Sequence, residues 1–162
     1  MTTISPHLTW ILLSLASAAL VLASLLLTPW LELEPCHLCV FQRLLFMLIA
    51  VLALGAALSA GRVRFVLGAL LALTAAAGTA TAAYQSWLQE YAAGSVSCVA
   101  SEMGPIERLI EWLGQQAPTL FLATGFCEDK ALVLLGLSMA QWALLFFIGM
   151  LAMTVWQLRA NR

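Results

Sequence analysis

Charged residues are scarce in this chain. Asp, Glu, Lys and Arg make up 9% of its 162 residues, while 63% are hydrophobic. A soluble domain typically carries about 25% charged residues, and a chain this short cannot bury so many apolar side chains in a soluble core. The composition therefore excludes an ordinary soluble domain and predicts that membrane lipid surrounds most of the chain. Nucleic acid is not an expected partner.

Basic residues are absent from the start of the chain, since residues 1–7 contain no Lys or Arg. A secretory signal peptide has a basic n-region and an apolar stretch of about 7–15 residues. The first apolar run, residues 8–29, is longer than that. We therefore expect this segment to be retained as a membrane-spanning helix.

The chain contains four long apolar runs. A transmembrane helix needs about 20 residues, and four segments meet this length, at about 8–29, 40–60, 63–84 and 140–158. The sequence therefore predicts an all-α membrane protein, residues 1–162 forming one antiparallel four-helix transmembrane bundle. Two outer loops connect the spans, at about 30–39 and 85–139, and we expect residues 131–139 to lie at the membrane interface before the last span.

The basic residues indicate how the bundle is oriented. Four of the seven lie in the short turn between spans two and three or in the C-terminal tail: Arg62, Arg64, Arg159 and Arg162. Cytoplasmic loops carry an excess of Lys and Arg. We therefore expect both termini in the cytoplasm and both outer loops on the opposite side.

All four cysteines lie in or at the edge of these outer loops: Cys36, Cys39, Cys98 and Cys127. Disulfides form and persist in oxidising compartments such as the bacterial periplasm. The placement of the cysteines therefore predicts disulfide chemistry on the outer side of the membrane.

The first pair forms a Cys-X-X-Cys motif, Cys36-His37-Leu38-Cys39, directly before the second span. Pro35 suits the first turn of a helix, which would place both sulfurs at the positive end of the helix dipole and favour the thiolate. A spacing of three brings the sulfurs to one helix face. A structural disulfide and half of a zinc site are the alternatives that this spacing leaves open.

Arg43 follows Cys39 by four residues, so we expect it one turn deeper on the same face. An arginine within a span is costly and is functional by default, although a long side chain near a helix end also snorkels to the interface. A guanidinium here would stabilise a Cys39 thiolate and donate hydrogen bonds to a quinone oxygen. A zinc site would gain nothing from it, so Arg43 favours redox chemistry.

The second pair, Cys98 and Cys127, lies in the long outer loop. Cys98 follows the small and polar residues 92–97, which indicate a flexible stretch that another protein can reach. Between the two cysteines, one apolar helix face is predicted over 105–114: Ile106, Leu109, Ile110 and Leu113. This short amphipathic helix either lies flat at the membrane interface with Trp112 near the headgroups or packs on the tops of the spans.

Taken together, these features resemble the disulfide bond formation protein B (DsbB) family. The matching elements are Pro35-Cys36-X-X-Cys39 with Gln42-Arg43, Cys98, Cys127 within Thr124–Glu128, and residues 136–142 at the start of the last span. The resemblance covers nearly the whole chain, with the same order of cysteines.

The resemblance implies a thiol:quinone oxidoreductase of the bacterial inner membrane, with redox disulfides Cys36–Cys39 and Cys98–Cys127. A reduced periplasmic partner of the DsbA type, with a thioredoxin fold, would attack at Cys98. Cys127 would then exchange with Cys36 through a Cys36–Cys127 intermediate. Cys39 would reduce a bound quinone, ubiquinone or menaquinone, with Arg43 as a quinone-binding residue.

Two positions depart from the family pattern. The chain has Ala140 where family members often have Pro, and the third span contains no histidine. We therefore expect Gln85, Gln89 or solvent to supply any polar group that the chemistry needs at the outer end of that span.

Three other interpretations compete with this one. A vitamin K epoxide reductase-like quinone reductase also has a four-helix core, but its Cys-X-X-Cys lies late in the core, whereas here it opens the second span. A non-enzymatic scaffold with two structural disulfides leaves Arg43 unexplained. A zinc site built from all four cysteines is the third; we expect no metal.

Overall fold

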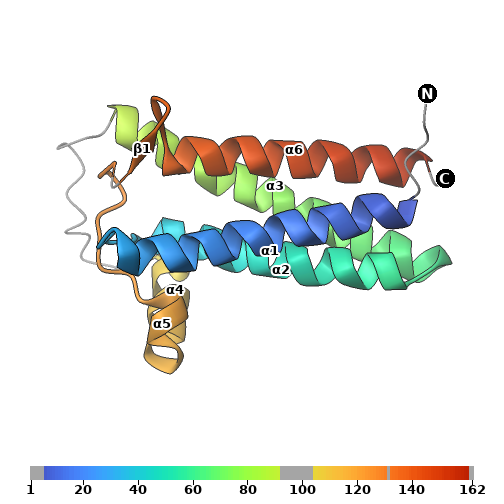
Figure 1. The fold of residues 1–162 in the computed structure, drawn as a ribbon, viewed down its shortest axis with the longest axis horizontal. Helices are drawn as coiled ribbons and strands as arrows, with labels where there is room; N and C mark the ends of the chain where they lie inside the picture. Colours follow the sequence, from blue (N-terminus) through green and yellow to red (C-terminus); the bar gives the residue numbers. More distant parts are fainter. Residues whose placement is uncertain (1–5, 92–103, 131, 161–162) are drawn as a thin grey trace.

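The computed structural model describes residues 6–91, 104–130 and 132–160. Within these ranges four helices are long and apolar enough to cross a membrane: α1 (Pro6–Trp30), α2 (His37–Leu58), α3 (Gly61–Tyr91) and α6 (Met139–Ala160). They lie side by side as an up-and-down bundle (Figure 1). The predicted all-α membrane bundle with four spans is confirmed.

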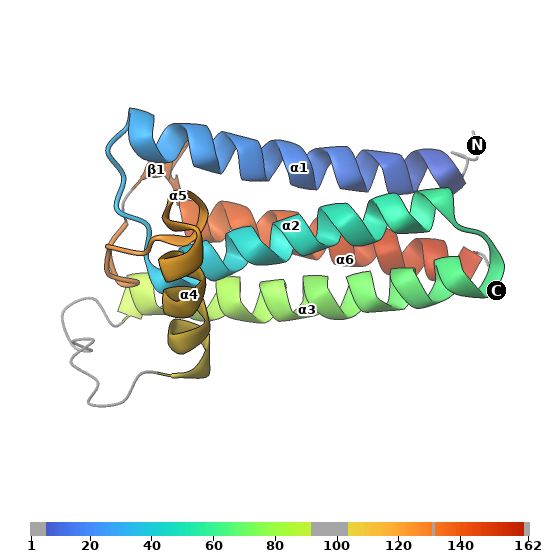
Figure 2. The same cartoon turned by 90° about the horizontal axis from the view of Figure 1, so that it is seen from below.

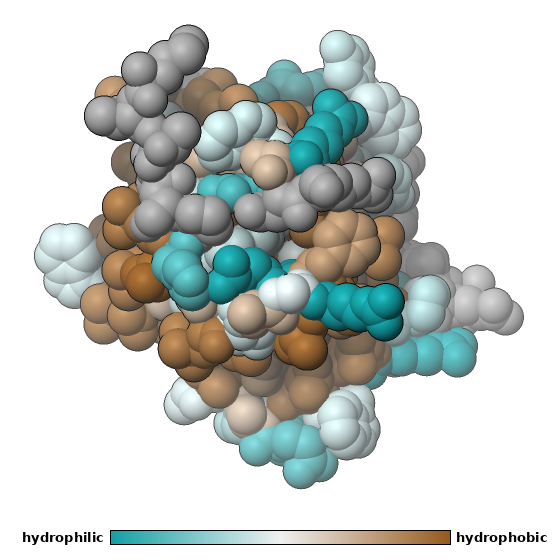
Figure 3. All heavy atoms as spheres, turned by 90° about the vertical axis from the view of Figure 1, so that its right-hand side faces the viewer, coloured by the Kyte–Doolittle hydropathy of each residue, from teal (hydrophilic) through white to brown (hydrophobic). Residues whose placement is uncertain are grey.

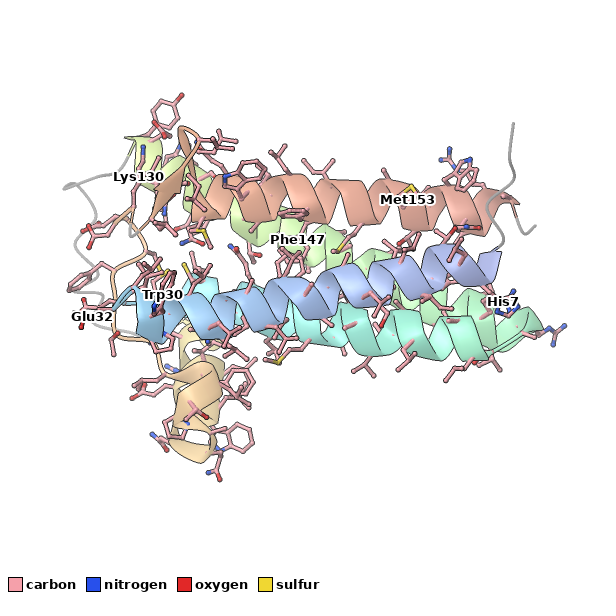
Figure 4. The ribbon with its side chains drawn as sticks, viewed as in Figure 1. His7, Trp30, Glu32, Lys130, Phe147 and Met153 are labelled. Carbon is pink, nitrogen blue, oxygen red and sulfur yellow. The ribbon has the colours of Figure 1, made fainter. Side chains whose placement is uncertain are left out.

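The helices pack in chain order, α1 on α2, α2 on α3 and α3 on α6, as Figure 2 shows from a second side. Small residues on the inner face of α3, including Ala75 and Gly78, are buried and let the neighbouring helices approach closely. At the centre of the bundle the rings of Phe46 and Phe147 stack with centroids 4.1 Å apart. Figure 4 labels Phe147 in this position.

Arginine side chains lie at the end of the bundle where α1 begins and α6 ends. Arg64 donates hydrogen bonds to the carbonyl oxygens of Ala56 and Ser59, close to the end of α2, and Arg62 and Arg159 are exposed. Figure 3 looks onto this end and shows its hydrophilic side chains. Cys36, Cys39 and Cys127 lie at the opposite end; Arg162 lies outside the described residues.

A short helical arm lies across the other end of the bundle (Figures 1 and 2). It consists of α4 (Pro105–Gln116) and α5 (Pro118–Phe121). The predicted amphipathic helix is therefore confirmed, and it ends two residues later than expected. Ile110 packs with Val40 of α2, whereas Leu109 and Trp112 are 41% and 58% exposed. One face of α4 thus packs on the spans, while Leu109 and Trp112 stay exposed on its other side.

Three features of the fold differ from the sequence prediction. Helix α3 continues to Tyr91, seven residues past the predicted end of the span, because Gln85 and Gln89 are buried and hydrogen-bonded there. Helix α2 begins at His37, so Pro35 precedes the helix and does not belong to its first turn. The segment before α6 forms a hairpin, β1 (Val133–Leu134) and β2 (Leu137–Ser138).

Gly78 gives a direct test of the packing, because a Cβ atom there would overlap the ring of Phe147. Phe147 is fully buried and stacked on Phe46, so it has no room to move. We expect Gly78→Ala to destabilise the bundle by about 1–3 kcal/mol, the usual cost of overpacking, as measured by thermal unfolding in detergent. Gly149→Ala is the matched control, because a Cβ at Gly149 meets nothing within 4 Å; equal stability of the two variants would contradict the packing.

Candidate functional site

The Cys-X-X-Cys motif forms the N-terminus of α2. Cys36 is the residue that caps the helix, and its sulfur accepts a hydrogen bond from the backbone N–H of Cys39 at 3.4 Å. The two sulfur atoms lie 3.2 Å apart. The prediction that this spacing brings both sulfurs together at the positive end of the helix is confirmed. Cys36 is only 2% exposed.

Cys127 reaches the same place from the second outer loop. The backbone N–H groups of Thr124 and Gly125 both donate to the carbonyl oxygen of Pro35, at 2.9 and 3.2 Å. These bonds fix the loop against the residue before Cys36, and the Cys127 thiol is hydrogen-bonded with that of Cys36. Cys36, Cys39 and Cys127 are free thiols. Cys98 lies outside the described residues.

The contact between Cys36 and Cys127 shifts the pKa values of the two thiols in opposite directions. The hydrogen bond with Cys127, the hydrogen bond with Cys39 and burial all raise the pKa of Cys36 above its ordinary value. The same contact with Cys36 lowers the pKa of Cys127, helped by the backbone N–H of Leu38 and opposed by burial. Cys127 is therefore the better nucleophile of the two, since the thiolate is the attacking form.

Gly125 sets how closely the two loops approach. A Cβ atom at this position would overlap the carbonyl oxygen of Glu34, so one of the two backbone segments would have to move. We expect Gly125→Ala to slow formation of a Cys36–Cys127 disulfide by about tenfold to a hundredfold, since misplacement by about 1 Å costs that much in a positioned reaction.

The measurement uses a Cys39→Ser, Cys98→Ser background, in which Cys36 and Cys127 are the only thiols, and follows their oxidation by thiol labelling. Thr124→Ala serves as the control, because it keeps the backbone N–H that donates to Pro35. An unchanged rate for Gly125→Ala would show that the close approach of the loops does not govern the exchange.

The side chain of Arg43 is only 6% exposed. Its guanidinium donates hydrogen bonds to protein acceptors. Its Nε donates to Ser24 Oγ at 3.1 Å, Nη2 to Thr28 Oγ1 at 3.1 Å and Nη1 to the carbonyl oxygen of Leu120 at 2.9 Å. The side chain therefore joins α1, α2 and α5, which a side chain snorkelling into water does not do. A guanidinium has five N–H bonds, so donors beyond these three remain.

A cavity of about 140 Å³ lies between α1, α2 and α6 beside this arginine. Its polar lining includes Cys39, Gln42 and Arg43, and its apolar lining includes the rings of Phe46 and Phe146. Phe146 is also 41% exposed, so the cavity borders the outer surface of the bundle. The structure thus places Cys39 and Arg43 at one cavity, as their spacing predicts.

Two glutamines, Gln85 and Gln42, contribute to the site, and the sequence predicts this only in part. Gln85 donates from Nε2 to the sulfurs of Cys39 and Cys36, at 3.0 and 3.3 Å, and accepts from Gln42 at 2.8 Å. Both glutamines are buried. The lack of histidine in the third span predicts a polar role for Gln85, Gln89 or solvent, whereas Gln42 enters the sequence prediction only as the neighbour of Arg43. A polar amide in an apolar span, three residues from a reactive cysteine, was the available signal.

Similarity to known proteins agrees with this arrangement. The family model described as "Disulfide bond formation protein DsbB" matches residues 6–157. The chain belongs to the DsbB family. It is 42% identical over 144 residues to Disulfide bond formation protein B of Dechloromonas aromatica, covering 88% of this chain and 86% of the relative. The corresponding protein of Stutzerimonas stutzeri is 36% identical over 159 residues, covering 95% of each chain.

In this DsbB-family chain the loop after Cys127 is tied to the extension of α3. Gln89 donates to the carbonyl oxygen of Asp129 at 3.1 Å and accepts from Ser138 Oγ at 2.7 Å. Lys130 and Glu90 form a salt bridge of 2.6 Å, and Figure 4 labels Lys130 at this end of the bundle. The seven unforeseen residues of α3 therefore hold the loop that carries Cys127.

The zinc interpretation needs all four cysteines, and Cys98 lies outside residues 6–91, 104–130 and 132–160. Within these ranges no group of three or more His, Cys, Asp or Glu side chains has an arrangement able to hold a metal ion. The family match also favours the DsbB interpretation over a vitamin K epoxide reductase-like one.

Proposed function

We propose that this chain is a thiol:quinone oxidoreductase that forms disulfides, reoxidising a periplasmic dithiol protein of the DsbA type and passing the electrons to membrane quinone. One observation carries the proposal. Three thiols from two outer loops meet beside a cavity that also contains a buried arginine. Structural disulfides need no such cavity. The relatives named Disulfide bond formation protein B support the same function.

The residues then act in sequence. A thiolate of the partner attacks the Cys98–Cys127 disulfide and forms a mixed disulfide with Cys98, and Cys127 leaves with the electron pair. The Cys127 thiolate attacks Cys36, so that the Cys36–Cys127 bond forms and the Cys36–Cys39 bond breaks. Cys39 leaves as a thiolate carrying two electrons. The hydrogen bonds from Thr124 and Gly125 to Pro35 support this step, because they hold Cys127 against Cys36.

The cavity suits a quinone ring. Its volume is about 140 Å³, and an apolar cavity of about 150 Å³ accommodates a benzene ring. When bound, a quinone supplies the two-electron oxidant. Arg43 has N–H donors left for a ring oxygen, and such donors stabilise developing negative charge most strongly in a dry site. Phe46 and Phe146 add apolar rings to the lining of the cavity.

The proposal places the sulfur end of the bundle in the periplasm and both termini in the cytoplasm, following the arginines at the other end. A membrane-impermeant maleimide added to intact spheroplasts is then expected to label Cys98 in a Cys127→Ser variant. A cysteine introduced at Arg62 is the control and is expected to react only after lysis. Labelling of Cys98 only from the cytoplasmic side would exclude the whole mechanism.

The decisive experiment is turnover by the purified protein. With a reduced DsbA-type protein and ubiquinone or menaquinone analogues, we expect loss of quinone absorbance in step with oxidation of the partner. Both quinones are supplied, because the proposal covers either one. A well-folded protein that exchanges no disulfide and reduces neither quinone would be the non-enzymatic scaffold.

A further inference from the structure

A pair of buried amides faces the two sulfurs of the Cys-X-X-Cys motif from α3 and α2. Gln85 is 1% exposed and Gln42 is 5% exposed. The Gln85 amide nitrogen lies 3.0 Å from the sulfur of Cys39 and 3.3 Å from that of Cys36, while its oxygen accepts from Gln42 Nε2 at 2.8 Å. Every hydrogen-bonding group of the Gln85 amide therefore has one partner.

Gln42 determines which end of the Gln85 amide faces the sulfurs. An amide presents either two N–H donors or an acceptor oxygen, depending on how it is turned. Because the Gln42 N–H₂ group occupies the oxygen of Gln85, the donors of Gln85 are left for the sulfurs. Turned the other way, the two N–H₂ groups would face one another, and a buried donor without an acceptor is costly.

N–H donors directed at the sulfurs stabilise the reduced Cys36–Cys39 pair more than they stabilise its disulfide. In the disulfide both sulfurs are neutral and are weak acceptors. When the Cys36–Cys39 bond breaks, the electron pair stays on Cys39 as a thiolate, and hydrogen bonds to a charged group are stronger than those to a neutral one. The shorter of the two contacts of Gln85 is the one to Cys39.

We propose that Gln85 is a catalytic residue that stabilises the Cys39 thiolate released when the Cys36–Cys39 disulfide is opened, and that Gln42 is the positioning residue that keeps the donors of Gln85 on the sulfurs. The inference rests on the proposed function in taking Cys36–Cys39 as a redox pair. It adds a source of thiolate stabilisation that carries no charge and comes from α3.

The test measures the Cys36–Cys39 couple without partner or quinone. In a Cys98→Ser, Cys127→Ser background, the protein is equilibrated with thiol–disulfide buffers, and its reduced fraction is read by maleimide mass shift. Gln85→Met keeps length and volume but removes the donors. We expect its equilibrium constant for reduction to fall at least about tenfold, the lower limit for a hydrogen bond to a charged group, or about 30 mV for two electrons.

A second readout is the pH profile of Cys39 alkylation, which we expect to move to higher pH in Gln85→Met. Gln42→Met should give a smaller change of the same sign in both measurements, because Gln85 is then free to turn. It also carries the test alone if Gln85→Met does not fold. Gln89→Met is the matched control: Gln89 is a buried glutamine one turn further along α3 that bonds to Asp129 and Ser138, and we expect neither readout to change.

Two results would overturn the inference: a folded Gln85→Met protein with the parental potential and pH profile, or equal shifts in Gln85→Met and Gln89→Met. These results are independent of the proposed function, because no quinone or partner is present. Loss of quinone turnover in the parental chain would remove the proposed function and leave a measured effect of Gln85 on the couple intact.

Discussion

Replacing Cys39 by Ser is expected to abolish quinone reduction while leaving the chain able to take electrons from its partner. In the proposed relay the partner reduces a Cys98–Cys127 disulfide, and Cys39→Ser leaves both of these cysteines in place. The next exchange forms the Cys36–Cys127 bond only by displacing the sulfur of Cys39, and a serine provides no disulfide to open. The chain therefore stops after one partner equivalent.

Cys98→Ser is expected to fail at the opposite end of the relay. In the proposed relay it removes the sulfur that the partner attacks, but it leaves Cys36, Cys39 and Arg43 beside the cavity. A small dithiol that reaches the Cys36–Cys39 pair directly should therefore still drive quinone reduction in this variant. With the protein partner, turnover should be lost.

The two variants are compared in one pair of assays, oxidation of the reduced partner in a single turnover and quinone reduction driven by a small dithiol. Cys39→Ser should pass only the first assay and Cys98→Ser only the second. If both variants fail only in the assay with the partner, the cysteine pairs do not have these separate roles in partner oxidation and quinone reduction.

The sequence predicted the parts of this protein that depend on regular patterns. Four apolar runs of span length predicted α1, α2, α3 and α6, and the 3.6-residue periodicity of residues 105–114 predicted α4. The spacing of three in Cys36-His37-Leu38-Cys39 predicted adjacent sulfurs, which the structure places 3.2 Å apart. Each of these patterns arises within one segment of the chain.

The features that the sequence did not predict depend on contacts between distant segments. Gln89 extends α3 because its amide finds Asp129 and Ser138, which lie 40 and 49 residues away. Gly125 is close to Glu34 only in the folded chain. The partner of Gln85 is Gln42, 43 residues away. No local periodicity encodes these pairings, so the sequence left the amides beside the sulfurs and the fastening of the Cys127 loop undetermined.

Arg43→Ala is expected to reduce the efficiency of quinone reduction by about a hundredfold or more, the usual cost of removing a donor that stabilises a developing oxyanion. Arg43→Lys keeps the charge but loses the planar set of donors, so we expect a partial loss of roughly tenfold. Stopped-flow quinone reduction by the prereduced chain measures this step without the partner.

The structural contacts of Arg43 call for a control, because its guanidinium also holds Ser24, Thr28 and Leu120 together. Both Arg43 variants should therefore unfold at lower temperature. Thr28→Val removes one of these acceptors, and Thr28 does not line the cavity. We expect Thr28→Val to lose stability and yet reduce quinone at close to the wild-type rate.

This comparison separates the two roles of the arginine. If quinone reduction falls only in proportion to stability across Thr28→Val, Arg43→Lys and Arg43→Ala, Arg43 acts as a structural link between α1, α2 and α5. If Arg43→Ala keeps the wild-type rate and affinity for quinone, the cavity beside Cys39 is not the quinone site. A loss specific to the Arg43 variants is the result we expect, because the guanidinium has N–H bonds beyond the three that its structural partners use.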